Sequence, residues 1–401
     1  MSLLRRQHLG FYIIALLLIT GCSKVDYVKV DSPAYLRVFN NLNYEKTLDS
    51  KDQEIPFLAM LIDPVMDKDG MPVSTKILGD FLDQRAPYAP PYPSHIGNST
   101  SVNNPEYPGK EDVLVAPVLN GFDLSSWAQI PSGKHRIVFL FRPKNTVPFF
   151  ELESRLKTKV LIDTTLVLDE KEVYTLNVLQ KDYQTKKNGI LLRHENFYKL
   201  PLSDSLVYVN FYNLSSKGYW EADYTGKGAN IGNKGALGDG IRDRMNVFYT
   251  LYRKSSTESS LSNYFGKYLG ELKRNTGEPD VSPYYSFPLF ADPLSDGINT
   301  DIWQRLDLLA PGMDPSSKPY TGIQMQTDNN WAPISCFANG TLPLDIIRGD
   351  ENYVLLPNMI VNIHSGVYKS RSFATVNTIE IVNGKAYLTT IQRKYAAPIY
   401  K

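Results

Sequence analysis

Apolar and polar residues alternate over short stretches along much of the chain, the pattern of half-buried β-strands. Two of these stretches resemble each other: AYLRVFNNL at 34–42 and LVYVNFYNLS at 206–215 both alternate and both run into Asn-Leu. Further strands are predicted at 136–143, 244–253 and 353–363. Many short strands separated by turn signals favour antiparallel sandwiches over β-α-β units.

A second pair of similar segments lies later in each half of the chain. TLVLDEKEVYTLNVLQKDY at 165–183 and NTIEIVNGKAYLTTIQRKY at 377–395 are both predicted to form hairpins. The second contains Asn383-Gly384, the strongest short-range hairpin signal. In this alignment Tyr174 and Tyr387 occupy equivalent places. Two similarities in the same order indicate a duplicated β-domain.

Helical periodicity occurs in a few places. Between residues 259 and 275 the apolar side chains recur at the spacing of one helical face, and Ser259 or Ser260 is a candidate cap. We interpret this stripe as core packing against a sheet, with a partner-binding helix as the alternative. Shorter helices are predicted at 75–84 and 301–309. The stripe consists of Leu261, Tyr264, Phe265, Tyr268, Leu269 and Leu272.

The first 21 residues are organised as a secretory leader. Arg5 and Arg6 precede an apolar run of about eleven residues, where a bilayer span needs about 20. The run ends in ITGC at 19–22, which resembles the bacterial lipobox. By that resemblance Cys22 would be acylated and become the first residue of the mature protein. An ordinary cleavage nearby, with Cys22 a free thiol, is the alternative.

Cysteine content and charge narrow the class of protein further. The chain has two cysteines, so an acylated Cys22 leaves Cys336 without a disulfide partner, and we expect Cys336 to be a small buried apolar residue. Of 43 basic residues, Arg5 and Arg6 leave with the leader, so 41 face 42 acidic ones. This balance argues against a nucleic-acid surface. No later stretch approaches 18 apolar residues, so membrane attachment would rest on the acyl chains.

A lipobox followed by strand–insertion–hairpin repeats, which begin with Tyr-x-Arg-Val-x-Asn-like strands, resembles the cell-envelope lipoproteins of Bacteroidota. Within that group the chain is most similar to a repeat family of unknown function with an immunoglobulin-like fold. The resemblance covers the leader and part of each half, and the insertions at 83–112 and 213–243 have no counterpart in it. SKVD at 23–26 matches the surface-export signal of these lipoproteins only in part.

Pattern and resemblance together predict a mostly β protein with two antiparallel immunoglobulin-like β-sandwich domains and loop and short helical insertions. We place the boundary within HENFYKLPLSDS at 194–205, so a fragment that ends near residue 200 should fold alone. The alternative is one larger sheet in which Tyr35–Phe39 pairs with Val207–Phe211. The predicted parts are the leader at 1–21, a lipidated tether at 22–33, a first sandwich at 34–200, and a second sandwich at 201–401 with a helical insertion near 259–275.

Acidic turns are weak candidates for metal binding. Asp67, Asp69 and Gly70 have the spacing of the middle of a calcium loop, but positions 65 and 76 lack the acidic ligands of an EF-hand. We interpret this segment as a turn, and no histidine pair has the spacing of a zinc site. No metal and no cofactor are therefore predicted. A second acidic group with the same interpretation consists of Asp292, Asp296 and Asp301.

Catalytic motifs are also absent from the sequence. It contains no Gly-x-Ser-x-Gly elbow, Walker loop or His-Glu-x-x-His helix. The glycine-rich segment at 225–240 lacks the register of a phosphate-binding loop and is interpreted as a surface loop. No catalytic residue is predicted. A carbohydrate-active hydrolase, which needs two opposed carboxylates, is the alternative.

Aromatic residues in two segments are the candidate ligand-binding residues. Tyr88 and Tyr92 lie in the proline-rich RAPYAPPYPSH at 85–95, which is poorly suited to a sheet ladder. Tyr219, Trp220 and Tyr224 lie beside the glycine-rich loop. Rings with an apolar face and a polar edge suit contact with sugars or protein. The alternative is that these rings fold back as lids over the ends of the sandwiches.

The sequence therefore predicts a non-enzymatic lipoprotein, anchored at the bacterial outer membrane and exposed on the cell surface, that acts as a binding or assembly subunit. Its partners would be the lipid bilayer through Cys22 and either a glycan captured for an importer or an outer-membrane protein complex. Two short segments also resemble the O-glycosylation pattern of these bacteria, with Thr164 and Ser205 as the candidate acceptors.

Overall fold

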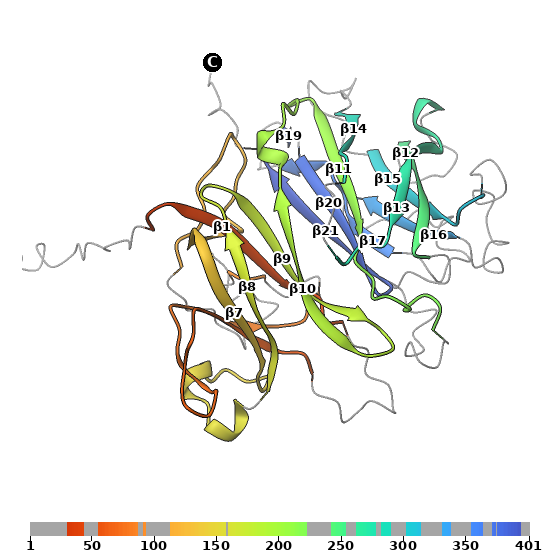
Figure 1. Ribbon diagram of the computed structural model, residues 1–401. Coiled ribbons are helices and arrows are strands. Elements are labelled where there is room, and N and C mark those ends of the chain that lie inside the picture. Colours follow the sequence, from red (N-terminus) through yellow and green to blue (C-terminus); the bar gives the residue numbers. More distant parts are fainter. Residues whose placement is uncertain are drawn as a thin grey trace, which may run out of the picture.

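The computed structural model describes only part of the chain, and every structural statement below concerns that part. The described chain is mostly β, as the sequence predicts, and it forms two β-sandwiches (Figure 1). The described residues are 30–43, 55–86, 91–93, 113–157, 159–222, 242–253, 262–277, 282–289, 302–313, 331–337, 354–363, 371–373 and 375–393.

The first sandwich consists of two four-stranded sheets. Its inner sheet, which faces the second sandwich, has the order β10-β9-β1-β6, and its outer sheet has the order β5-β2-β7-β8. The strands are β1 (Pro33–Asn40), β2 (Leu58–Ile62), β5 (Ile77–Leu82), β6 (Ala128–Pro131), β7 (Gly133–Phe141), β8 (Val160–Leu168), β9 (Val173–Asp182) and β10 (Lys187–Glu195). Short elements between them are β3 (Val65–Met66), β4 (Pro72–Ser74) and the 3-10 helices η1 (Phe149–Glu151), η2 (Ser154–Leu156) and η3 (Phe197–Lys199).

The second sandwich repeats this arrangement. Its inner sheet has the order β14-β11-β20-β21, and its outer sheet has the order β13-β12-β15-β16-β17. The strands are β11 (Leu206–Asn213), β12 (Arg244–Arg253), β13 (Lys267–Lys273), β14 (Tyr285–Pro288), β15 (Ile302–Leu309), β16 (Trp331–Phe337), β17 (Val354–Pro357), β20 (Thr375–Val382) and β21 (Lys385–Gln392). Short elements are η5 (Ser262–Tyr264), β18 (Val361–Ile363) and β19 (Arg371–Phe373).

Each inner sheet contains one parallel pair, so the sheets are mixed rather than purely antiparallel. β1 runs parallel to β9, and β11 runs parallel to β20 in the same relative register. The other neighbours of these two strands, β6 and β14, are antiparallel. β1 and β11 do not pair with each other, so the alternative of one larger sheet joining them is wrong.

The alternation of side chains explains how the inner sheets become buried on both faces. Leu36 and Val38 of β1 point into the core of the first sandwich, together with Met60 and Phe139 of the outer sheet. Tyr35, which precedes Leu36 and points to the opposite face, belongs to a different apolar cluster that also contains Val376 of the second sandwich. The molecule is therefore a stack of four sheets, with the two inner sheets packed against each other.

Several predicted strands and one turn are confirmed. β12 has the predicted bounds, and β7 contains most of the predicted strand at 136–143. β20 and β21 form a hairpin whose turn residues Asn383 and Gly384 both have positive φ, as a type I′ turn requires. The predicted strand at 353–363 is instead two short strands, β17 and β18.

The predicted hairpin at 165–183 is wrong. β8 pairs with β7 in the outer sheet, whereas β9 pairs with β1 and β10 in the inner sheet, so the chain crosses between layers here. The counterpart of the β20–β21 hairpin is therefore β9–β10. Tyr174 lies on β9 and Tyr387 on β21, so these two residues are not equivalent, although the repeat itself recurs in the strand order.

The three predicted helices are strands, so the helical insertion near 259–275 is also wrong. Residues 75–84 contain β5, residues 301–309 contain β15, and the stripe at 259–275 contains η5 and β13. A bulge in β13 shifts its register against β12, so Leu269 and Leu272 both contact the core although they are three residues apart. β15 lies at the centre of its sheet and is buried throughout, which removes any alternation.

No helix in the described part of the chain is long and apolar enough to cross a membrane.

Candidate functional site

Three of the five aromatic residues proposed from the sequence are buried. Tyr92 is 2% exposed and is hydrogen-bonded through its backbone to Val38. Tyr219 and Trp220 are each 9% exposed, and their rings meet edge to face at 4.8 Å within the core of the second sandwich. These three rings therefore do not face solvent, which corrects their assignment as surface ligand contacts and agrees with the alternative that they fold back.

Of the other proposed residues, some lie among the described residues and the rest lie outside them. Thr164 lies half-buried in β8, and Ser205 is exposed in the connector before β11. The remaining features lie outside the described residues: the leader, Cys22, Tyr88, Tyr224, the glycine-rich segment, and Asp292, Asp296 and Asp301.

The Asp67 segment is a turn between β3 and β4. The carboxylate of Asp67 accepts hydrogen bonds from the backbone N–H groups of Asp69 and Met71 at 2.9 and 2.8 Å. One carboxylate oxygen is thus used to close the turn, as the sequence interpretation expects. No group of three or more His, Cys, Asp or Glu side chains suited to a metal ion occurs in the described residues.

Cys336 is a buried core residue, as predicted. It is inaccessible within β16, and burial raises the pKa of its thiol to about 12. A thiol that is neither ionised nor accessible is not a nucleophile.

Two carboxylates do meet inside the molecule, but not in a cleft. Glu195 and Glu380 both accept hydrogen bonds from Arg193, and their exposed fractions are 4% and 0%. A substrate cannot reach them, so this pair does not provide the opposed carboxylates of a hydrolase.

Exposed aromatic rings occur at one edge of the second sandwich, which we call the β13 edge (residues 265–273). Phe265 and Tyr268 are 46% and 54% exposed. Tyr268 packs against Phe248 of the neighbouring strand, with ring centroids 5.2 Å apart, and this contact restricts the position of the Tyr268 ring. Half-exposed rings that are held in place by a sheet offer a flat apolar surface at low entropic cost.

Charged side chains lie on the same strand as Tyr268 and on its neighbour β12. Lys267 and Lys273 are exposed, and Glu271 accepts hydrogen bonds from Arg244 of β12 and pairs with Lys273 at 2.6 and 3.1 Å. Three cations and one carboxylate thus lie on the two strands that carry Tyr268 and Phe248. The β13 edge combines ring faces with hydrogen-bonding groups, the usual composition of a polar-ligand or partner surface.

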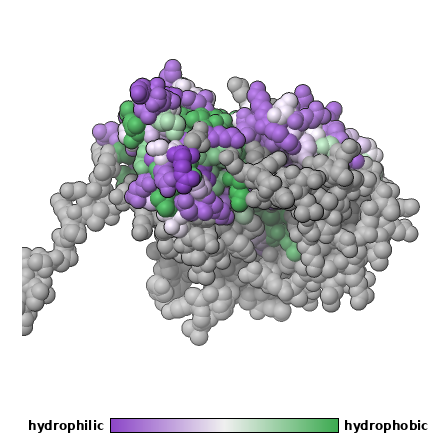
Figure 2. Space-filling model, turned by 90° about the horizontal axis from the view of Figure 1, so that it is seen from below, coloured by the Kyte–Doolittle hydropathy of each residue, from purple (hydrophilic) through white to green (hydrophobic). Residues whose placement is uncertain are grey.

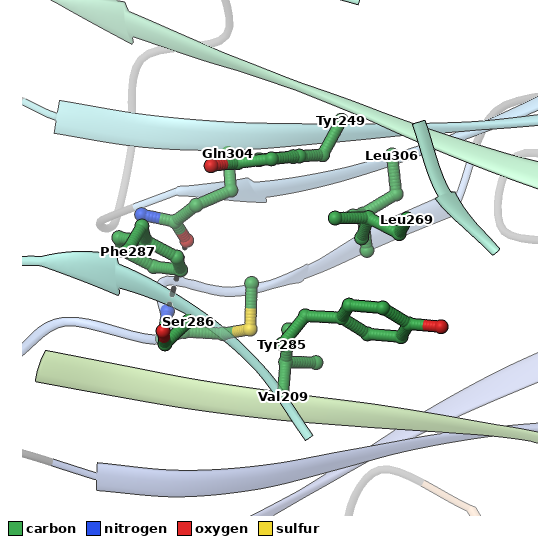
Figure 3. Close-up of a pocket in the computed structure, with 9 residues that line it drawn as sticks. Val209, Tyr249, Leu269, Tyr285, Ser286, Phe287, Gln304 and Leu306 are labelled. Atoms are coloured by element: carbon green, nitrogen blue, oxygen red, sulfur yellow. Dashed lines mark hydrogen bonds between the residues drawn. The ribbon is translucent and has the colours of Figure 1, made fainter. Parts of the chain in front are cut away.

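A narrow slot lies behind the β13 edge, between the two sheets (Figure 3). The volume of this cavity is about 10 Å³, which is close to what one water molecule needs. The hydroxyl of Tyr249 is buried and has no hydrogen-bond partner among the described residues, and burial raises its pKa. The slot is lined by Val209, Tyr249, Leu269, Tyr285, Ser286, Phe287, Gln304, Leu306 and Met359. It is too small for an organic ligand in this conformation, so the candidate contact surface is the exposed edge outside it.

Gly270 determines how closely the two edge strands approach. It lies in β13 at φ +155°, and a Cβ at this position would collide with the hydroxyl of Tyr285 in β14. Glycine therefore permits the tyrosine to lie across the bulge and close the slot. The edge is a packed structure and not a loose terminus.

The described surface does not present a broad apolar patch. Apart from Phe265 and Tyr268, the large apolar side chains that are exposed there are mostly valines, which lie on short strands, on β8 and in connecting segments. Figure 2 shows one face, on which hydrophilic residues surround smaller apolar patches. Protein docking through a broad apolar surface finds no support in this part of the chain.

Comparison with known proteins gives little guidance. No family model matches the chain, and no curated protein matches it. A solved structure of a putative cell adhesion protein from Bacteroides ovatus aligns over 93% of this chain and 99% of its own, at 9% identity and a TM-score of 0.16. A TM-score this low carries no argument about fold or function.

From the sequence, the residues of the β13 edge are predicted to belong to a helix. Tyr264, Phe265 and Tyr268 all belong to the predicted helical stripe. A signal for the alternative was present in Gly270, which is unfavourable inside a helix and typical of a β-bulge.

Proposed function

We propose that this protein is a non-enzymatic lipoprotein of the bacterial cell surface, anchored through acylated Cys22, that captures a glycan at the β13 edge. The observation that carries the binding proposal is the pair of half-exposed rings, Phe265 and Tyr268, on a sheet edge with flanking charged groups. Rings of this kind stack on the apolar faces of sugars, while lysine, arginine and carboxylate groups bind their hydroxyls.

Two features support the anchoring: the leader, and the length of the segment that joins Cys22 to the first sandwich. Cys22 is followed by ten residues before β1 begins at Pro33. An extended chain spans at most about 3.5 Å per residue, so this segment can separate the sandwich from a bilayer by up to roughly 35 Å. The resemblance to Bacteroidota lipoproteins adds the outer membrane as the location.

We expect cells fed an alkynyl fatty acid to label the wild-type protein and not the Cys22→Ser variant. Cys336→Ser is the matched control and should keep the label, because Cys336 is buried in the folded domain. Label retained in Cys22→Ser would place the lipid elsewhere and remove the anchor from the proposal.

Affinity electrophoresis in native gels that each contain one polysaccharide tests glycan binding. We expect at least one polysaccharide of the panel to slow the wild-type protein, and the Phe265→Ala/Tyr268→Ala variant to migrate freely in the same gel. Removal of two stacking rings should weaken binding by at least tenfold, since each ring is worth about 1 kcal/mol or more. Val167→Ala is the control, because Val167 is exposed on the first sandwich. Free migration of the wild-type protein in every glycan would count against glycan capture.

The second candidate is docking to an outer-membrane protein complex through the same rings. It predicts a different result: the double variant would lose copurification with a membrane complex, while no glycan would retard either protein.

A further inference from the structure

The two inner sheets meet through equivalent parts of the repeat. Asn40 of β1 and Asn213 of β11 are equivalent, because each ends its strand in a parallel bridge to the segment after the outer sheet's edge strand, at Gln84 and Arg274 respectively. Counting from these positions, Tyr35 corresponds to Tyr208 and Val173 to Val376, and all four belong to one apolar cluster between the sandwiches.

A second interface cluster shows the same correspondence. Leu179 corresponds to Val382 and Leu191 to Tyr387, and these four residues pack together. When a residue and its equivalent both lie in one interface, the two halves are related by an approximate two-fold axis, as in a symmetric dimer.

Hydrogen bonds cross the interface in both directions, as an approximate two-fold relation predicts. Asn43 donates to the backbone carbonyl of Val382 at 2.7 Å, and its equivalent Ser216 donates to the carbonyl of Gln180 at 2.7 Å, one residue beyond Leu179, the equivalent of Val382. Tyr387 donates to the carbonyl of Arg85, which follows β5. In the opposite direction Lys181 donates to the carbonyl of Thr276, which follows β13.

The centre of the interface breaks this symmetry through its charges. Arg85 and Arg193 of the first half both donate to Glu380 of the second half, Arg85 at 2.5 Å. Arg193 also donates to Glu195 at 2.8 Å. All four side chains are at most 8% exposed, so these pairs are almost completely desolvated.

The positions equivalent to these charged residues carry neutral side chains. Glu380 corresponds to the neutral Asn177, so a second copy of the first half would not supply the carboxylate. At the charged centre of the interface, three arginines and one glutamate come from the first half and Glu380 comes from the second half. The first-half residues Arg37, Arg85, Arg193 and Glu195 correspond to Asn210, Asn275, Thr389 and Ile391.

We infer that the inner face of the first sandwich is a recognition surface for the second sandwich, and that the two halves bind each other without the connector as a selective one-to-one pair. Apolar clusters on both sides of the charged centre supply affinity, and the arginine–glutamate contacts oppose pairing of like halves. The protein is thus a fused heterodimer whose two subunits descend from one repeat.

The test uses the full chain after the leader, with a specific protease site inserted between the exposed residues Ser203 and Asp204 and an affinity tag at the C-terminus. After complete cleavage, capture through the tag should retain both halves in equal amounts, and light scattering should give the mass of the uncut chain. First halves that wash through, or like halves that pair, would overturn the inference.

Glu380→Arg tests the selection by charge, because it places a third cation between Arg85 and Arg193. The cut variant should release its first half, while Glu170→Arg, the same change at an exposed turn position, should retain it. Retention of the first half by cut Glu380→Arg would overturn the role of the charges.

A milder pair of variants keeps the test decisive if Glu380→Arg fails to fold before cleavage. Asn43→Ala and Ser216→Ala each remove one hydrogen bond across the interface, made by equivalent donors in opposite directions. Each should weaken association of the cut halves about fivefold, the effect of one lost hydrogen bond of about 1 kcal/mol. No effect from either variant would overturn the two-fold arrangement.

Discussion

Glu380 is a fully buried carboxylate whose charge is stabilised by two arginines of the other sandwich. Burial alone would raise its pKa, but Arg193 and Arg85 lower the pKa to about 2. Such a pair is costly to desolvate and costly to break, since removal of one partner leaves a buried charge alone. The residues next to Glu380 in the sequence do not indicate this ion pair, because Arg85 and Glu380 are 295 residues apart.

The depressed pKa of Glu380 predicts a loss of stability in acid. Its folded value of about 2 lies below the ordinary 4.5, so its contribution is complete above about pH 5 and is lost as the pH falls towards 2. The shift corresponds to about 3 kcal/mol. We expect Glu380→Gln to lower the free energy of unfolding by about this amount at pH 7 and by less at pH 2 to 3.

Urea unfolding followed between pH 7 and pH 2 measures this difference, with the exposed Glu170→Gln as control. Glu172, whose pKa is about 2 despite burial because Lys199, Tyr198 and His194 donate hydrogen bonds to it, titrates in the same range in every variant. The prediction therefore concerns the difference between the curves of unfolding free energy against pH for wild type and Glu380→Gln. Parallel curves for wild type and Glu380→Gln would contradict it.

At the scale of elements, β13 shows how a bulge imitates a helix in the sequence. The extra residue at the bulge brings Leu269 and Leu272 to the same face at a spacing of three, which period-counting assigns to a helix. Gly270 makes the bulge compatible with the close approach of Tyr285. The candidate contact surface depends on this packing.

We predict that Gly270→Ala destabilises the protein by about 1–3 kcal/mol, the range for an overpacked site. Tyr285→Phe removes the colliding oxygen, so the double variant should recover part of the loss. Gly133→Ala separates the two causes, because Gly133 has φ +119° with open space around it and reports backbone strain alone. Additive effects of Gly270→Ala and Tyr285→Phe in urea unfolding would show that the two residues do not collide.

At the scale of the whole molecule, the two sandwiches share a buried interface, and this changes the expectation for a single half. A fragment of residues 22–200 keeps all its strand pairs, since β1 to β10 pair among themselves. It also exposes the inner face of its sheet, including Leu179 and Leu191, and leaves Arg85 without Glu380.

We therefore predict that the 22–200 fragment unfolds at a lower temperature than the full chain, and that Leu179→Ser/Leu191→Ser improves its solubility by removing the exposed apolar face. Thermal unfolding and solubility measurements on both fragments test this. A fragment as stable as the full chain would contradict the prediction and restore the sequence-based expectation of an independent domain.

The sequence by itself determined the features that depend on neighbouring residues. It predicted a β-rich chain, the strands around 34–42, 206–215 and 244–253, the Asn383-Gly384 turn, and the burial of Cys336, all of which are confirmed. Lipidation at Cys22 is also a local motif and stays a prediction. Each of these follows from residue type and spacing within a few positions, where propensity and periodicity act directly.

Only the tertiary structure decided which strands share a sheet and which rings reach solvent. The crossing from β8 to β9, the burial of Tyr92, Tyr219 and Trp220, and the exposure of Phe265 and Tyr268 all depend on what another part of the chain covers. The charged centre between the halves depends in the same way on distant segments. A local pattern does not contain this information, because burial and pairing are set by contacts between residues hundreds of positions apart.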